Sequence, residues 1–154
     1  MDNNGQLHIE IRSKNILKRL FKNSDIMFIQ LPDKYTIKGA EFVPSQPSDF
    51  IVMYNKNKSA FLEYKWVEDG KQFSLMMFNP YQTKFIENCF NKGIPYIILL
   101  ENVAVNEYYI FDISPIWGQF VSSDKTKISF TWEELKEYYI EEIEDVVSSL
   151  KGLE

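Results

Sequence analysis

The stretch PSDFIVMYNKNKSAFLEYKW, residues 47–66, decides the fold. It holds two apolar segments around a polar turn, and three charged residues interrupt those segments: Asp49, Glu63 and Lys65. Removing an unpaired charge from water is costly, so charges in buried strands need partners or a bound metal ion. Two carboxylates and an ammonium in this order indicate a divalent-metal site that hydrolyses a phosphodiester bond.

The alternation of side chains along a strand tests this interpretation. Glu63 and Lys65 share one face, and Tyr64 points to the other. In an antiparallel pair, directly opposite residues point to the same face. Asp49 therefore joins the face of Glu63 and Lys65 only if the residue numbers of each opposite pair add up to an even number. A loop of odd length meets this condition, for example three residues centred on Asn57, which would place Asp49 opposite Lys65. A two-residue turn would put Asp49 on the wrong face.

The residue types suit a hard cation, because Mg²⁺ prefers carboxylate and carbonyl oxygens. We expect Asp49 and Glu63 to supply carboxylates and Tyr64 a main-chain carbonyl, with Mn²⁺ as a substitute ion. The cation would polarise the phosphoryl group and lower the pKa of bound water. Lys65 would orient that water and offset negative charge in the transition state. The alternative is a Glu-x-Lys on an exposed strand, with a chance aspartate upstream; aromatic and aliphatic neighbours on both faces favour the metal site.

Two residues outside the stretch extend the candidate site. Gln82 lies on the apolar face of a predicted helix, at its N-terminal edge, where its amide could hydrogen-bond water or a phosphate. The same face carries Phe85, Ile86 and Cys89. Glu10, near the apolar stripe of the first helix, is a candidate extra ligand. The ordinary alternatives are a helix-edge glutamine and a solvated glutamate.

Periodicity and capping signals predict an α/β chain with a mixed central sheet flanked by helices. Asn79 and Pro80 suit the start of one helix and Gly93 its end, while Thr131 and Glu134 form a capping-box pattern for another. The expected helices span residues 7–22, 79–93 and 131–150, and the expected strands span 26–31, 50–54, 60–67, 94–100 and 108–113.

The composition of the 154 residues, 45% hydrophobic and 16% aromatic, suits a single domain over 1–154 with one core. The net charge of −5 is unevenly spread. Residues 1–95 carry 13 Lys/Arg against 10 Asp/Glu, whereas residues 96–154 carry 4 against 12. Binding to phosphates depends on the local electrostatic field and not on the total charge. The candidate site lies within residues 1–95, where basic residues outnumber acidic ones. The acid is concentrated in the last predicted helix, which should point away from bound nucleic acid.

Other classes of protein find little support. Cys89 and His8 are each the only residue of their type, which excludes an internal disulfide and a thiolate zinc site and leaves Cys-His catalysis improbable. There is no glycine-rich phosphate loop. The N-terminus is polar, unlike a signal peptide, and no apolar run approaches the roughly 20 residues that span a bilayer. We therefore expect a cytoplasmic protein with no membrane partner.

In order and spacing, these residues resemble the PD-(D/E)XK nuclease superfamily, whose core is restriction-endonuclease-like. Within it the chain is most similar to RecU-type and related phage or archaeal Holliday junction resolvases. The resemblance covers about residues 5–113. It is carried by Glu10, the strand and turn from Phe28 to Pro32, Asp49, Glu63, Lys65, Tyr81-Gln82 and the segment from Gly93 to Ile98.

The resemblance implies a Mg²⁺-dependent endodeoxyribonuclease of DNA recombination and repair, acting as a homodimer on branched or junction DNA. Its catalytic residues would be Asp49, Glu63, Lys65 and Gln82. The connection over 33–46, a candidate protruding hairpin, lies where RecU-like resolvases carry a stalk that enters the junction. Two alternatives stay open: a nuclease without junction preference, and a non-catalytic DNA- or protein-binding module with the same fold. A host and a viral origin are equally compatible with the sequence.

Overall fold

The computed structural model describes residues 3–32, 45–68 and 71–153. Most of the predicted protruding connection, residues 33–44, therefore lies outside the described residues. The elements in chain order are α1 (Asn3–Lys22), β1 (Met27–Gln30), β2 (Phe50–Asn55), β3 (Lys58–Val67), β4 (Phe73–Ser74), η1 (Leu75–Met77), α2 (Pro80–Lys92), β5 (Tyr96–Asn102), β6 (Glu107–Asp112), α3 (Ser114–Ser122), β7 (Ser129–Phe130), η2 (Lys136–Tyr138), β8 (Tyr139–Ile140), η3 (Ile143–Asp145) and α4 (Val146–Gly152).

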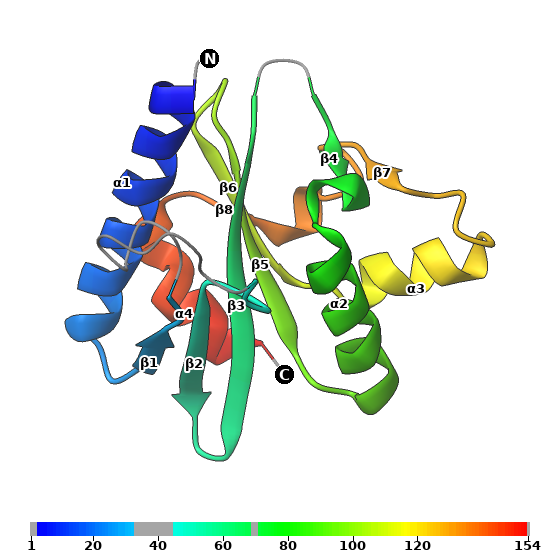
Figure 1. Ribbon diagram of the computed structural model, residues 1–154. Coiled ribbons are helices and arrows are strands. Elements are labelled where there is room, and N and C mark those ends of the chain that lie inside the picture. Colours follow the sequence, from blue (N-terminus) through cyan, green and yellow to red (C-terminus); the bar gives the residue numbers. More distant parts are fainter. Residues whose placement is uncertain (1–2, 33–44, 69–70, 154) are drawn as a thin grey trace.

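A mixed sheet of the described strands, in the order β1-β2-β3-β5-β6-β8, forms the middle layer. The β3–β5 pair is parallel, with α2 in the connection between them, and the other neighbours are antiparallel. Helices α1 and α4 lie on one side of the sheet, and α2 and α3 lie on the other (Figure 1). The predicted α/β class, a mixed sheet between helices, is confirmed.

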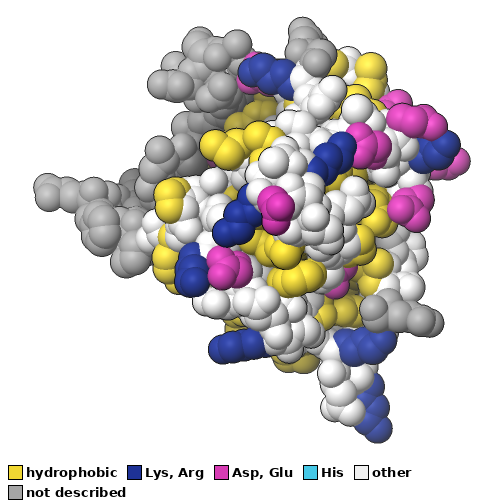
Figure 2. All heavy atoms as spheres, turned by 90° about the vertical axis from the view of Figure 1, so that its right-hand side faces the viewer, with side chains coloured by type: hydrophobic (Ala, Val, Ile, Leu, Met, Phe, Trp, Pro, Cys, Tyr) yellow, Lys and Arg dark blue, Asp and Glu magenta, His cyan; other side chains and the backbone are white. Residues whose placement is uncertain are grey.

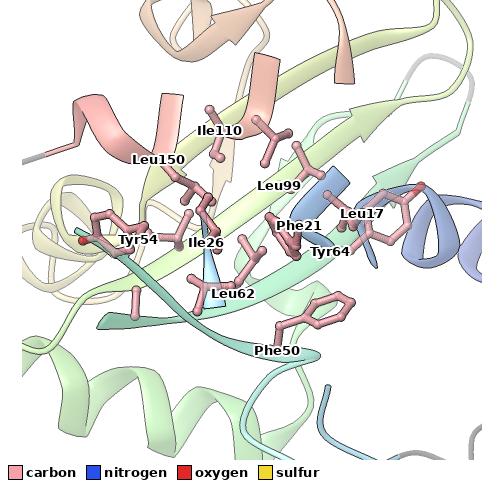
Figure 3. Packing of buried hydrophobic residues seen from close by; sticks show 14 of the residues in the cluster. Leu17, Phe21, Ile26, Phe50, Tyr54, Leu62, Tyr64, Leu99, Ile110 and Leu150 are labelled. Atoms are coloured by element: carbon pink, nitrogen blue, oxygen red, sulfur yellow. The ribbon is translucent and has the colours of Figure 1, made fainter. Parts of the chain in front are cut away.

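Two apolar cores hold the layers together. On one side, Leu17 and Phe21 of α1 and Leu150 of α4 pack on Leu62 and Leu99 of the sheet (Figure 3). All five side chains are completely buried. Completely burying such a side chain is worth about 1.5–3 kcal/mol, so this core fixes α1 against the sheet.

The second core lies under α2 and α3. Ile86 and Cys89 of α2 and Trp117 of α3 contact a cluster that includes Ile98 and Leu100 of β5. Because β5 is covered by helices on both sides, every one of its side chains is buried. This is the pattern expected for a strand in the middle of a three-layer fold.

The β2–β3 hairpin differs from the predicted loop. It has a tight two-residue turn, in which Asn57 takes the left-handed conformation (φ 64°) that asparagine tolerates. Met53 pairs with Ser59 and Asn55 pairs with Lys58, so Tyr54 is an extra residue on β2. This β-bulge shifts the pairing by one residue.

The bulge sets the register of the strand that Asp49 precedes. Above the bulge Phe50 pairs with Leu62, and the Asp49 main-chain N–H also donates to the Leu62 carbonyl, so the regular register ends at Phe50. The expected odd-length loop and the expected pairing with Lys65 are therefore wrong. Asp49 nevertheless lies close to Glu63, as the sequence predicts.

The predicted helix over 131–150 is also wrong. Thr131 and Glu134 make the expected capping contacts, but the helical turn they cap ends at once. Tyr139 and Ile140 instead form β8, which pairs with β6 at the sheet edge. Helical spacing would stack acidic residues three and four apart, which is unfavourable, whereas aromatic and β-branched residues suit a strand.

Helix α3 was not predicted. It has Pro115 in its first turn, and the Asp112 carboxylate accepts hydrogen bonds from the main-chain N–H and the hydroxyl of Ser114. Gly118 inside it lowers intrinsic helix propensity, so packing of Ile116 and Trp117 on the second core supplies the stability. Among the described helices, none has the length and apolarity to cross a membrane.

Candidate active site

Three predicted site residues come together on the α2 side of the sheet, and the fourth adjoins them. Glu63 of β3 is buried, and its Oε2 atom lies 3.2 Å from Lys65 Nζ and 2.5 Å from Gln82 Nε2. Asp49, just before β2, lies beside Glu63 and contributes to its electrostatics. The three segments meet because β2 and β3 pair here and α2 begins directly above them.

Gln82 is oriented by the cap of its own helix. The Asn79 side chain accepts a hydrogen bond from the Gln82 main-chain N–H (2.8 Å), and Gln82 Oε1 accepts one from the Asn79 N–H (3.3 Å). This capping box uses the amide oxygen, so the amide N–H₂ group is turned towards Glu63. The Asn-x-x-Gln spacing was visible in the sequence but was not recognised there as a capping box.

Asp49 is held by the turn that precedes β2. The Ser48 hydroxyl donates to the Phe50 carbonyl, and the buried Tyr96 hydroxyl donates to the Pro47 carbonyl. Asp49 Oδ2 accepts the main-chain N–H of Tyr64 at 2.8 Å. The N–H and C=O of one strand residue point to the same side, so the Tyr64 carbonyl is directed to the side where Asp49 lies.

Lys65 has a defined position. Its ammonium lies between the Glu63 carboxylate and the ring of Phe78, whose centroid is 5.1 Å from Nζ. The side chain is 17% exposed. A cation over an aromatic ring is favourable, so Lys65 is held close to the carboxylates while it stays accessible to a ligand.

The protonation of Glu63 depends on its surroundings. Burial and the adjacent negative charge of Asp49 raise the pKa of Glu63 to about 8, although Lys65 opposes this change. A buried carboxyl group beside another carboxylate retains its proton to higher pH. The pair is therefore suited to a cation in place of that proton.

Glu63 makes the stability of the metal-free protein depend on pH. In the unfolded chain its carboxyl ionises near its ordinary pKa of 4.5, whereas in the folded chain it keeps its proton up to about pH 8. Folding thus takes up a proton between these values, and stability is lost as the pH rises through that window. We expect urea unfolding in EDTA to show a decline from pH 5 to 8 that is smaller in Glu63→Gln, while Glu87→Gln, on the exposed side of α2, should keep the wild-type slope.

Glu10 contacts a lysine. Glu10 Oε1 lies 2.8 Å from Lys14 Nζ, one helical turn away on α1, and the same ammonium lies 2.7 Å from Asp49 Oδ1. Lys14 is buried, and the sequence analysis did not identify it as part of the site. Its i, i+4 spacing from Glu10 was the available signal.

The donor set fits a divalent cation. Two adjoining carboxylates, Asp49 and Glu63, and the Tyr64 carbonyl are hard oxygen donors. Among the described residues there is no cluster of three or more Asp, Glu, His or Cys side chains. Two carboxylates suffice for Mg²⁺, which usually keeps several water ligands.

A comparison with solved structures identifies the architecture. The chain is similar to Hjc of Archaeoglobus fulgidus, a Holliday junction resolvase from an archaeal hyperthermophile, with a TM-score of 0.50. The sequences are 14% identical, and the match covers 90% of this chain and 97% of the other. The fold is restriction-endonuclease-like. No family model and no curated protein sequence matches the chain.

A second polar cluster in this restriction-endonuclease-like fold lies behind the site, on the α1 side of the sheet. The buried Glu101 carboxylate of β5 accepts hydrogen bonds from Tyr64 Oη (2.6 Å), Ser13 Oγ (3.2 Å) and the Arg12 guanidinium (3.1 Å). Burial and the Glu101 charge raise the pKa of Tyr64, which keeps its hydroxyl a donor. The cluster ties α1, which carries Lys14, to the strand of the site. Arg12 thus directs its guanidinium to Glu101.

Removing the Tyr64 hydroxyl should destabilise the protein. In Tyr64→Phe, Glu101 stays buried with one donor fewer, and loss of a hydrogen bond to a charged group costs about 1.5–3 kcal/mol. Urea unfolding should show a lower midpoint with an unchanged slope. Tyr139→Phe is the matched control, because that side chain is exposed. Equal midpoints for the two variants would contradict the importance of this cluster.

Proposed function

We propose that the chain is a Mg²⁺-dependent DNA endonuclease that acts on branched DNA. The observation that carries the proposal is the meeting of Asp49, Glu63 and Lys65 at the paired ends of β2 and β3. Carboxylates for a cation and an adjacent ammonium are the groups that phosphodiester hydrolysis requires. The fold shared with a Holliday junction resolvase favours DNA as the substrate and a branched form of it.

Each residue has a distinct task in the proposed reaction. Asp49, Glu63 and the Tyr64 carbonyl would hold the cation. When bound, Mg²⁺ would supply Lewis acidity towards the phosphate and promote ionisation of a water molecule. Lys65 would neutralise charge that develops on the phosphate in the transition state, and Gln82 would keep Glu63 in the required rotamer.

The distribution of charge supports approach of DNA to the half of the sheet that contains β1 and β2, away from the β8 edge. The acidic stretch of the C-terminal part runs along β8 and η3, and β8 is the sheet edge opposite β1. The face over α2 and α3 carries charges of both signs, interspersed rather than gathered in one field (Figure 2). Lys18, Arg19 and Lys22 of α1 offer positive charge on the half of the sheet that holds the site.

A substrate panel tests the proposal. The protein should cleave a four-way junction in Mg²⁺ or Mn²⁺ and leave it intact in EDTA, with a linear duplex of the same sequence cut less efficiently. Equal cleavage of junction and duplex would favour a nuclease without junction preference. Binding without cleavage in both metals would favour the non-catalytic module and overturn the proposal.

We also propose that the active form is a homodimer. A four-way junction has two symmetry-related strands to cut, and a two-fold protein matches that symmetry. Light scattering of the protein used in the cleavage assay should give twice the 18.2 kDa chain mass. A monomer that cuts both strands would contradict this part of the proposal.

A further inference from the structure

Lys14 is a buried lysine that contacts the candidate metal site from another element. It belongs to α1, whereas Asp49 precedes β2, and its ammonium lies 2.7 Å from Asp49 Oδ1. Only 7% of the side chain is exposed. A buried lysine is costly unless its charge is paired, so this ion pair is a fixed part of the site and not a surface contact.

The geometry of Asp49 makes this contact important. Its Oδ2 atom accepts the Tyr64 main-chain N–H, which leaves Oδ1 as the oxygen that faces Lys14. Glu10 holds the other side of the ammonium at 2.8 Å. Lys14 therefore gives Asp49 the positive charge that a divalent cation at the same carboxylate would give.

Helix α1 keeps Lys14 in this place. Ser13, the preceding residue, is bound to Glu101, and Leu17, one turn later, is completely buried in the first core. Two anchors on either side of Lys14 prevent the helix from turning its ammonium away. The contact with Asp49 is thus a consequence of how α1 packs.

We propose that Lys14 competes with the divalent cation for Asp49 and so sets the metal affinity of the site. The inference rests on the proposed function, because it assumes that Asp49 is a metal ligand. Two positive groups near one carboxylate oxygen repel each other, so metal binding has to displace the ammonium from Oδ1 while Glu10 retains it. Lys14 keeps the metal-free site neutralised and folded, at the expense of metal affinity.

The test measures metal binding directly and does not require cleavage. Mn²⁺ affinity is measured by titration calorimetry for the wild type and for Lys14→Met, which keeps the length of the side chain and removes its charge. We expect at least about tenfold tighter binding in Lys14→Met, because a full charge 2.7 Å from a ligand oxygen is lost. Lys22→Met, on the exposed last turn of the same helix, should bind as the wild type does.

Thermal unfolding gives a second readout. In EDTA, Lys14→Met should unfold at a lower temperature than the wild type, because two carboxylates lose their counter-ion. Saturating Mn²⁺ should raise its unfolding temperature more than that of the wild type. Lys14→Gln serves if the methionine variant does not fold, and Lys14→Arg, which keeps the charge, should retain the weaker affinity.

The outcomes separate the inference from the proposed function. If the wild type binds Mn²⁺ and neither uncharged variant binds it more tightly, Lys14 is only structural and the inference is overturned. If neither the wild type nor any Lys14 variant binds Mn²⁺, the proposed metal site and the proposed function are both wrong, and the inference on Lys14 is overturned with them. If affinity rises in Lys14→Met and the rise disappears when Asp49→Asn is added, the competition at Asp49 is supported.

Discussion

Lys65→Ala should lower the single-turnover rate of DNA cleavage by about 10²–10³-fold, the usual effect of removing one group that stabilises transition-state charge. Lys65 lies 3.2 Å from the buried Glu63 carboxylate and is held over Phe78, so its ammonium is placed before substrate arrives. Affinity for the same junction should change only a few fold, because the interaction develops mainly in the transition state.

The matched control for this prediction is Lys58→Ala. Lys58 is exposed at the other end of the same strand and lies outside the site. It should cleave at the wild-type rate. A Lys65→Ala enzyme that also cleaves at that rate would show that the catalytic assignment is wrong, and the binding-module alternative would then gain support.

Asp49→Asn should abolish metal-dependent cleavage, with a loss of roughly a thousandfold or more, since the bound cation contributes several kcal/mol to the transition state. An amide has the shape of the carboxylate but carries no charge to hold the cation. The variant should also lose the rise in unfolding temperature that Mn²⁺ produces in the wild type. Measuring both quantities on one preparation distinguishes lost metal binding from lost structure.

Asp124→Asn is the conservative control for this change. Asp124 is exposed after α3 and has φ of 53°, a conformation that asparagine adopts readily. It should leave cleavage and the Mn²⁺ response unchanged. If Asp49→Asn still responds to Mn²⁺ as the wild type does, the cation is held elsewhere and Asp49 has another role.

The first two-thirds of the fold could be predicted because local signals and packing agree there. The periodicity of α1, the Asn79 cap of α2 and the alternation in β3 each specify an element that the sheet then uses. The common face of Glu63 and Lys65 follows from the backbone alone. For the same reason, Gln82 could be placed near them from the apolar stripe of its helix.

The remaining features depend on contacts between distant residues. Tyr139 and Ile140 form a strand because they pair with β6 at the edge of the sheet. The local sequence pattern, which is helical, does not indicate that this edge is available for pairing. The extra residue Tyr54 has no glycine to mark a bulge. In the sequence, Lys14 is one of several basic residues of α1. Its place in the site is evident only from its contact with Asp49 in the structure.

The bulge at Tyr54 has a consequence for how the length of this hairpin can vary. Because Tyr54 is the extra residue, deleting it while keeping the tight turn would remove the bulge and still leave Met53 opposite Ser59. Phe50 would stay opposite Leu62 and keep its place in the core. A chain that lacks this one residue should therefore keep the same face of β2 on the core, whereas one residue added with both the bulge and the tight turn kept would exchange the two faces, although the change lies at the opposite end of the strand from Asp49.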